Sequence, residues 1–224
     1  MERFGFESCN SVSTPMLKSS ETSESGKADE KVKEFPYRQA VGALMYLMLG
    51  TRPDLAYSIG FASRTLENPN NEDIVRVKRI FRYIAGTLTY GITYKSVQKR
   101  ILKIYSDADF GGCSKTGRST SGVLSMYAGG AISWLSQRQV IVATSTTEAE
   151  LIAASEATKE GIWLKRLFEE IVDLDSIPTL YVDNSAAVRL SQNPEYHRRT
   201  KHIPIKHFFV REKVSEELIE KELL

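Results

Sequence analysis

The segment ILKIYSDADFGG, residues 101–112, decides the fold of this chain, because a short apolar run there ends in Asp107 and then in glycines. Two later segments each carry an acid in a different setting: ATSTTEAELIAA contains Glu150, and PTLYVDNSAA contains Asp183. Asp107 and Asp183 close apolar strands, whereas Glu150 lies in the first turns of a long helical pattern. One sheet with one helix packed on it can bring these carboxylates together, and clustered carboxylates bind hard divalent cations.

The segments around these acids have the periodicity of an α/β fold. Apolar runs separated by turns rich in Gly, Ser and Thr predict strands at Ile101–Tyr105, Gly122–Tyr127, Ala131–Leu135, Val140–Thr144 and Thr179–Val182. Longer helical patterns predict helices at Thr146–Ile171, at Ser185–Gln192 and from about Ile205 onward. Strands in succession, followed by alternating strand and helix, predict a mixed sheet of three antiparallel strands and then a parallel strand, covered by helices.

A small helical segment precedes this sheet. Helices are predicted at Tyr37–Leu49, Pro53–Glu67 and Asn71–Ala85, with Pro53 in a first turn and Gly86 after the last helix. The third helix carries a basic flank, and we expect it to be either a solvated face or a surface that contacts a phosphate backbone. The flank consists of Arg76, Lys78, Arg79 and Arg82.

The composition divides the chain into regions. Residues 17–34 are mostly Ser, Glu and Lys, so burial would not offset the cost of ordering them, and we expect a disordered linker. The expected organisation is a tail and linker at 1–34, a helical segment at 35–95 and the mixed-sheet domain at 101–224. The net charge is only +2, so any affinity for nucleic acid must come from local patches.

The same composition bears on the compartment. Cys9 and Cys113 match no zinc or redox spacing, which favours free thiols in a reducing compartment. The longest apolar run, Val41–Leu49, is far short of the roughly 20 residues that span a bilayer, and the amino-terminal segment lacks the apolar core of a signal peptide. We therefore expect an intracellular protein of the cytoplasm or nucleus with no membrane partner.

The long helix offers two acids, and only one suits a metal site. Glu148 and Glu150 lie about 200° apart around a helix, so they cannot both serve one site. Ser145 and Glu148 have the spacing of a capping box, which gives Glu148 a structural role. Glu150 is therefore the better ligand. Two-metal hydrolysis of a phosphodiester needs such a carboxylate cluster, and oxygen ligands select Mg²⁺ or Mn²⁺.

Several motifs together resemble a known family. YSDADFGG, TGRSTSG, ISWLSQRQ, VATSTTEAELIAA, LYVDNSAA and HRRTKHI, in this order and spacing, resemble the ribonuclease H (RNase H) domain of copia-type retrotransposon Pol polyproteins. YRQAVGALMYLMLGTRPDLAYSIGFASR looks like the segment that connects the reverse transcriptase to that domain, and GFESCNSVSTPM looks like the end of the polymerase. The resemblance implies an RNase H-like fold and metal-dependent cleavage of RNA in an RNA:DNA hybrid. It makes Asp107, Glu150 and Asp183 the catalytic metal ligands.

The resemblance also implies partners, and the chain differs from the family pattern in one respect. The candidate contacts to the hybrid are Lys115, Arg118, Arg198, Arg199, Lys201 and His202. The reverse transcriptase body of a parent polyprotein is a further expected partner. In the family a fifth strand and a closing helix follow, and that helix carries a fourth metal ligand; we expect both elements to be missing here. His202 or Glu212 could then approach the site instead.

A second class of function stays open. Stand-alone fragments similar to this chain have been described as secreted RxLR-type effectors that act on plant proteins inside host cells. The nearest match to that motif is Arg100-Ile101-Leu102-Lys103, which lies in the first predicted strand without a preceding signal peptide. Under this alternative the protein is a re-used fragment that binds a host protein and has no enzymatic role.

Overall fold

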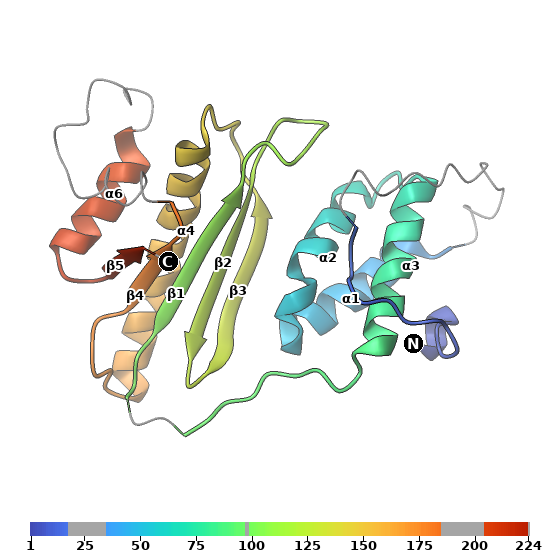
Figure 1. The fold of residues 1–224 in the computed structure, drawn as a ribbon, viewed down its shortest axis with the longest axis horizontal. Helices are drawn as coiled ribbons and strands as arrows, with labels where there is room; N and C mark the ends of the chain where they lie inside the picture. Colours follow the sequence, from blue (N-terminus) through green and yellow to red (C-terminus); the bar gives the residue numbers. More distant parts are fainter. Residues whose placement is uncertain (18–34, 97–98, 185–203, 224) are drawn as a thin grey trace. The chain divides into compact units, whose positions relative to one another are not determined.

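The computed structural model describes residues 1–17, 35–96, 99–184 and 204–223, and the chain divides into two compact units, Met1–Ile92 and Thr93–Leu224 (Figure 1). Except for residue 17, the predicted linker lies outside the described residues, and so does the predicted helix Ser185–Gln192. Within the described ranges, none of the helices is both long and apolar enough to cross a bilayer.

The first unit is helical, as predicted. Its described elements are η1 (Glu2–Phe4), α1 (Tyr37–Thr51), η4 (Pro53–Leu55), α2 (Ala56–Ala62), η5 (Ser63–Thr65) and α3 (Asn71–Gly86). The second predicted helix is shorter than expected, because 3-10 turns replace both of its ends. A capping box starts α3: the Asn70 side chain accepts a hydrogen bond from the Asp73 N–H, and the Asp73 carboxylate accepts one from the Asn70 N–H.

The amino-terminal tail packs on α3 and belongs to the core of this unit. The ring of Phe6 stacks on Phe81 with centroids 4.8 Å apart. The basic flank of α3 holds the same tail, since Arg82 Nε donates to the carbonyl of Asn10 at 2.7 Å and Arg79 Nη2 donates to Thr14 Oγ1 at 2.9 Å. These two arginines of the predicted basic flank therefore have partners within their own unit.

A buried arginine joins the end of α1 to the end of α3. The Arg52 side chain is 5% exposed, and it donates to the Asp54 carboxylate and to both the carbonyl and the hydroxyl of Thr87. The Tyr83 hydroxyl donates to the same carboxylate at 2.9 Å. Removal of the arginine would therefore take one donor from the Thr87 carbonyl and leave the Asp54 carboxylate without its cationic partner, with the Tyr83 hydroxyl as its remaining side-chain donor.

We expect Arg52→Ala to lower the free energy of unfolding of the first unit by about 3 kcal/mol, because the Asp54 carboxylate and the Thr87 carbonyl would both lose a hydrogen-bond donor. Arg38→Ala is the matched control, since Arg38 pairs with Glu67 on the surface with both side chains mostly exposed. This control should change stability by less than about 1 kcal/mol. Urea denaturation measures both, and equal losses would contradict the assigned role of Arg52.

The second unit is built on a mixed sheet. Its described strands are β1 (Lys103–Asp109), β2 (Thr120–Tyr127), β3 (Gly130–Arg138), β4 (Thr179–Val182) and β5 (Glu220–Leu223), in the order β3-β2-β1-β4-β5. The β1·β2 and β2·β3 pairs are antiparallel, and the β1·β4 and β4·β5 pairs are parallel. The predicted three antiparallel strands followed by a parallel strand are confirmed.

A long helix, α4 (Thr146–Ile171), lies along this sheet, and α6 (Pro204–Ser215) packs against α4 (Figure 1). The buried face of α4 is rich in alanine, which lets the helix approach the strands closely. Gly161 lies at one such close approach, because a Cβ there would collide with the Cδ1 atom of Ile104. Ile104, Leu151, Leu180 and Ile219 are among the fully buried residues of this core.

Two predictions about the sheet were wrong. Val140–Thr144 is not a strand, because β3 ends at Arg138 and the chain must turn within a few residues to begin α4. A fifth strand, expected to be missing, is present at Glu220–Leu223 and pairs in parallel with β4. Its residues are good helix formers, but Ile219 is 1% exposed in the core and places the following residues in register with β4.

Candidate metal centre

The register of two parallel strands places two of the predicted acids side by side. Tyr105 pairs with Tyr181 and Ser106 pairs with Val182, so Asp107 and Asp183 come next, side by side, at the same end of the two parallel strands. The rings of Tyr105 and Tyr181 stack with centroids 5.0 Å apart, two residues before each aspartate. This stack spans β1 and β4 beside the site.

The start of α4 supplies the third acid. Ser145 caps the helix, and its hydroxyl accepts a hydrogen bond from the Glu148 N–H at 3.1 Å, as predicted. The Glu148 carboxylate reaches one residue further than predicted and binds the N–H and hydroxyl of Thr144 at 2.6 Å. Glu148 is therefore structural, and Glu150 is the acid that faces β1, where its Oε1 accepts from the Ala108 N–H at 3.3 Å.

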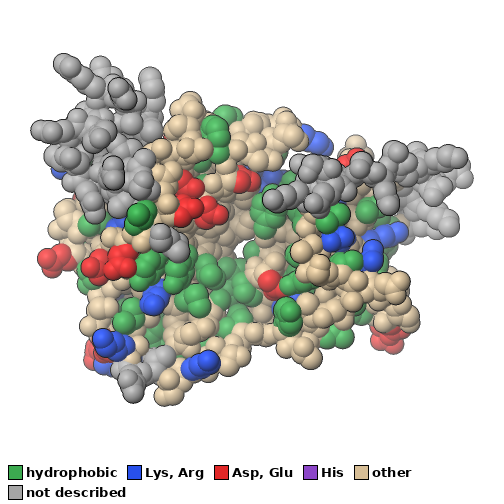
Figure 2. Space-filling model, in the orientation of Figure 1, with side chains coloured by type: hydrophobic (Ala, Val, Ile, Leu, Met, Phe, Trp, Pro, Cys, Tyr) green, Lys and Arg blue, Asp and Glu red, His purple; other side chains and the backbone are tan. Residues whose placement is uncertain are grey.

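The structure brings the three predicted acids together. One carboxylate oxygen from each of Asp107, Glu150 and Asp183 lies within 4.8 Å of the other two. Asp107 and Asp183 are exposed, whereas Glu150 is 7% exposed. Figure 2 shows acidic side chains gathered on the surface of the second unit, over the region where β1 and β4 end. The cluster is thus open on the aspartate side and closed by the helix on the other.

The electrostatics of Glu150 fit a cation site. Burial, reinforced by the nearby Asp183 and Asp107, raises the pKa of Glu150 to about 7. Its Oε2 atom is buried and has no hydrogen-bond partner among the described residues. A buried carboxylate that has one oxygen without a donor and lies beside two more carboxylates is an arrangement that a divalent cation would stabilise. The all-oxygen donor set suits Mg²⁺ or Mn²⁺.

The structure describes only two of the basic residues that were predicted to contact the hybrid. Lys115 is exposed and Arg118 is half-buried in the turn that connects β1 to β2. Arg198, Arg199, Lys201 and His202 lie outside the described residues. Glu212 does not join the acids in the described part of the chain: it is exposed on α6, and its carboxylate accepts from Lys213 Nζ at 2.7 Å. The suggestion that Glu212 supplies a fourth ligand was therefore wrong.

Sequence reasoning missed Arg138 and the setting of Cys113. Arg138 is the last residue of β3 and pairs with Thr120, which in turn pairs with Asp109. Arg138 therefore lies at the same end of the strands as the acids. Its Nη1 lies 3.7 Å from Cys113 Sγ. A hydrogen bond from Thr116, together with Arg138, lowers the pKa of the Cys113 thiol to about 7. A strand pattern that continued past Leu135 would have placed Arg138 there.

The stretch nearest to an RxLR motif is part of the folded domain. Arg100 forms a salt bridge with Asp175 at 2.8 Å, and its backbone N–H donates to the same carboxylate. Leu102 is 0% exposed in the core beneath α4. In the folded protein this stretch is therefore not an accessible linear motif.

The strand order, the long helix and the acids at one edge define an RNase H-like α/β domain. In overall fold the chain is similar to the foamy viral protease-reverse transcriptase solved in complex with dsDNA, with a TM-score of 0.50, 13% identity and coverage of 86% of this chain and 38% of that one. No protein-family model matches the chain.

Curated relatives identify the family. The chain is 44% identical, over an alignment of 222 residues that covers 97% of this chain, to the Retrovirus-related Pol polyprotein from transposon TNT 1-94 of Nicotiana tabacum. It is 46% identical over 133 residues to the Secreted RxLR effector protein 161 of Plasmopara viticola, covering 59% of this chain and 94% of that protein. The chain therefore belongs to the family of copia-type retrotransposon Pol polyproteins, and a related fragment carries the effector name. It spans 17% of the length of the tobacco polyprotein.

Proposed function

We propose that the second unit is a metal-dependent endoribonuclease that hydrolyses the RNA strand of RNA:DNA hybrids. The observation that carries this proposal is the convergence of Asp107, Glu150 and Asp183, whose carboxylate oxygens lie within 4.8 Å of one another. The cluster combines two exposed acids, which a substrate can reach, with one buried acid whose second oxygen lacks a donor among the described residues. Phosphodiester hydrolysis needs such a cluster.

In this proposal the three acids hold Mg²⁺ or Mn²⁺. When bound, the ion supplies an activated water and stabilises the charge that develops on the phosphate. The chain's own residues set the position of the ligands: the Ala108 N–H holds one oxygen of Glu150, and the register of β1 and β4 holds the two aspartates at one edge.

Hybrid recognition, in the same proposal, uses contacts to phosphates and 2′-hydroxyl groups, which require basic and polar side chains without base-specific geometry. Lys115 and Arg118, in the turn after β1, lie at the strand end that also carries the acids. Arg138 joins them from the end of β3. Arg198, Arg199, Lys201 and His202 complete the proposed set from the sequence.

The proposal is tested by incubating the purified chain with Mn²⁺ or Mg²⁺ and a labelled RNA:DNA hybrid, single-stranded RNA or double-stranded DNA. The expected result is cleavage of the RNA strand of the hybrid only, and its loss when EDTA removes the ion. Equal cleavage of single-stranded RNA would indicate a contaminating ribonuclease. No metal-dependent cleavage of the hybrid would reject the nuclease.

We expect the double variant Lys115→Ser with Arg118→Ser to weaken hybrid binding at low salt by about tenfold, because a protein that neutralises fewer phosphates releases fewer counterions when it binds. The slope of log K against log salt should fall by about 1 to 2. Lys165→Ser is the matched control, since Lys165 lies on α4 and pairs with Glu169. All variants are made in an Asp107→Asn protein, which is expected not to cleave the hybrid, and their affinities are measured by filter binding at several salt concentrations. An unchanged slope of log K against log salt would show that the two residues do not contact the hybrid.

The first unit has a proposed role in a longer polyprotein. We propose that residues 1–34 correspond to the end of a polymerase and a linker, that residues 35–95 connect a reverse transcriptase body to the nuclease, and that 101–224 form the nuclease domain. Similarity to the tobacco polyprotein over 97% of this chain supports this arrangement. The proposed site of action is inside the cell, in the cytoplasm or nucleus.

A second candidate function rests on one comparison. The 46% identity to the Secreted RxLR effector protein 161, over 94% of that protein, favours a re-used fragment that is secreted and binds a plant host protein. Detection of the native protein outside its producer cells, in culture filtrate or host tissue, would support this function. Confinement to producer cells would remove it, whatever the result of the cleavage assay.

A further inference from the structure

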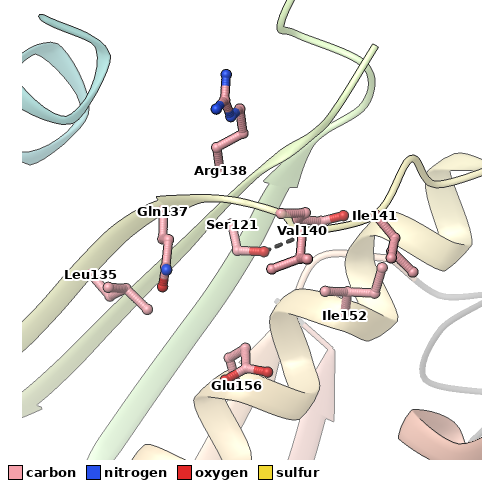
Figure 3. A pocket seen from close by; sticks show the side chains of 9 residues that line it. Ser121, Leu135, Gln137, Arg138, Val140, Ile141, Ile152 and Glu156 are labelled. Atoms are coloured by element: carbon pink, nitrogen blue, oxygen red, sulfur yellow. Dashed lines mark hydrogen bonds between the residues drawn. The ribbon is translucent and has the colours of Figure 1, made fainter. Parts of the chain in front are cut away.

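A pocket outside the metal centre lies in the second unit, between β3 and α4. It has a volume of about 180 Å³ and is enclosed by the end of β3, the segment that follows it and the first turns of α4 (Figure 3). None of the three clustered acids lines it. This volume suits one long side chain better than a drug-sized ligand.

Four of the nine residues that line the pocket are aliphatic, and its mouth is open. Leu135, Val140, Ile141 and Ile152 line it. Ile152 is 5% exposed and forms the floor, whereas Leu135, Val140 and Ile141 are 40%, 78% and 49% exposed. Val140 and Ile141 are β-branched residues with the preference for an extended strand, yet the described structure gives them no strand partner.

Two acceptors accompany this apolar wall, and the first is an amide oxygen. The Gln139 amide donates through Nε2 to Ser121 Oγ and to the Ala149 carbonyl, both at 2.9 Å, which fixes the orientation of the amide. Its Oε1 atom is left buried without a hydrogen-bond partner among the described residues, and the whole residue is 5% exposed. A buried acceptor of this kind requires a donor, and Gln139 is one of the residues that line the pocket.

The second acceptor is a carboxylate. Glu156 lines the pocket from α4, one turn beyond Ile152, and its side chain is 41% exposed. It also pairs with Lys159 at 3.1 Å, on the solvent side of the helix. Arg138, the basic residue of the lining, points away from the other side chains in Figure 3 and contacts Cys113 Sγ. The pocket is thus complementary to a group with an aliphatic stem and a cationic, donor-rich end.

The neighbouring strand edge indicates how such a group would be presented. In the described sheet β3 is the outermost strand on its side, so one row of its backbone N–H and C=O groups lacks a strand partner. An extended peptide can pair with such an edge and place alternate side chains beside it. Leu135 and Gln137, on the strand face that meets α4, line the pocket directly next to this edge.

We propose that this pocket and the free edge of β3 together bind an extended, arginine-bearing peptide segment of a partner protein. The peptide backbone pairs with β3. The arginine stem lies against Leu135 and Ile152, and its guanidinium donates to the Glu156 carboxylate and to Gln139 Oε1. This binding site is independent of the proposed nuclease activity, because it uses none of the clustered acids.

The test uses a short acetylated and amidated peptide with one central arginine flanked on each side by valine and threonine. Two matched peptides carry citrulline, which keeps the shape and loses the charge, or leucine, which keeps only the apolar stem. Titration into the ¹⁵N-labelled whole chain, in EDTA, is followed by amide chemical shifts. We expect shifts centred on β3 and on residues 139–156, with the arginine peptide binding about tenfold more tightly than the citrulline peptide.

Two variants and one control separate the contributions of the charge and of the apolar wall. Glu156→Gln should bring the arginine peptide to within about twofold of the citrulline peptide, whereas Glu170→Gln, on an exposed later turn of α4, should preserve the preference. Ile141→Ser, at the open mouth, should weaken all the peptides alike. Equal affinity for the arginine, citrulline and leucine peptides would overturn the proposal. So would an arginine preference that survives Glu156→Gln, or the absence of shifts at millimolar peptide.

Discussion

Replacement of Asp107 by asparagine is expected to reduce cleavage of the RNA strand in a hybrid by at least about 100-fold. The amide keeps the shape of the side chain but removes a negative charge from a cluster whose oxygens lie within 4.8 Å of one another. Metal assistance contributes several kcal/mol to such reactions, and each 1.4 kcal/mol corresponds to about a tenfold change in rate. Initial rates under single-turnover conditions with Mn²⁺ measure the effect.

Asp173→Asn is the matched control for this variant. Asp173 is exposed in the connection between α4 and β4, before β4 begins, whereas Asp183 follows the end of the same strand. The control should keep the rate of the unmodified chain. Circular dichroism of both variants should match the parent, because Asp107 is exposed and the loss of its charge relieves repulsion with Glu150. Activity of Asp107→Asn within about threefold of the parent would remove Asp107 from the site.

Glu150→Gln is expected to stabilise the metal-free protein above pH 7 while it abolishes the proposed nuclease activity. Burial and the two aspartates raise the pKa of Glu150 from 4.5 to about 7 in the folded chain. Between these values the folded protein holds a proton that the unfolded chain has released, so stability from this group is full below pH 4.5 and is lost as pH rises to about 7. The loss amounts to at most about 3 kcal/mol.

The glutamine variant cannot ionise, so its free energy of unfolding should lack this descent and exceed that of the parent at about pH 8 by up to about 3 kcal/mol. Urea denaturation in EDTA across this pH range measures the difference. Glu170→Gln, an exposed acid later on the same helix, should leave the descent intact. Adding Mg²⁺ should stabilise the parent and not the glutamine variant, because in the proposed function the ion binds the carboxylate cluster of the folded chain only. Identical pH profiles would contradict the burial assigned to Glu150.

These two variants answer different questions about one site. Asp107 is exposed, so its replacement tests the chemistry with little effect on stability. Glu150 is buried, so its replacement measures how much folding stability the chain loses by keeping an ionisable carboxylate at this position. A result in which Glu150→Gln stabilises the chain and Asp107→Asn is inactive would support a metal centre built at the expense of stability.

The acids were predictable because each occupies a position that local pattern reveals. Asp107 and Asp183 end runs of apolar alternation, and the capping role of Ser145 and Glu148 leaves Glu150 without a local partner. Arg138 was missed because its strand was predicted to end at Leu135. The position of Arg138 beside the acids depends on its pairing with Thr120, a partner eighteen residues away that a local pattern does not reveal.

The order of β1 to β4, the identity of the acidic residues and the starts of α1, α3 and α4 were determined by the sequence alone, since periodicity and caps act over a few residues. Tertiary contacts decided the rest. Glu220–Leu223 reads as a helix but pairs with β4, because the burial of Ile219 outweighs a weak local preference. Val140 and Ile141 read as a strand but lie in an exposed connection, because β3 has already ended and α4 must begin at Thr146. The proximity of the acids, likewise, exists only once parallel pairing and close helix packing join segments that are far apart in the chain.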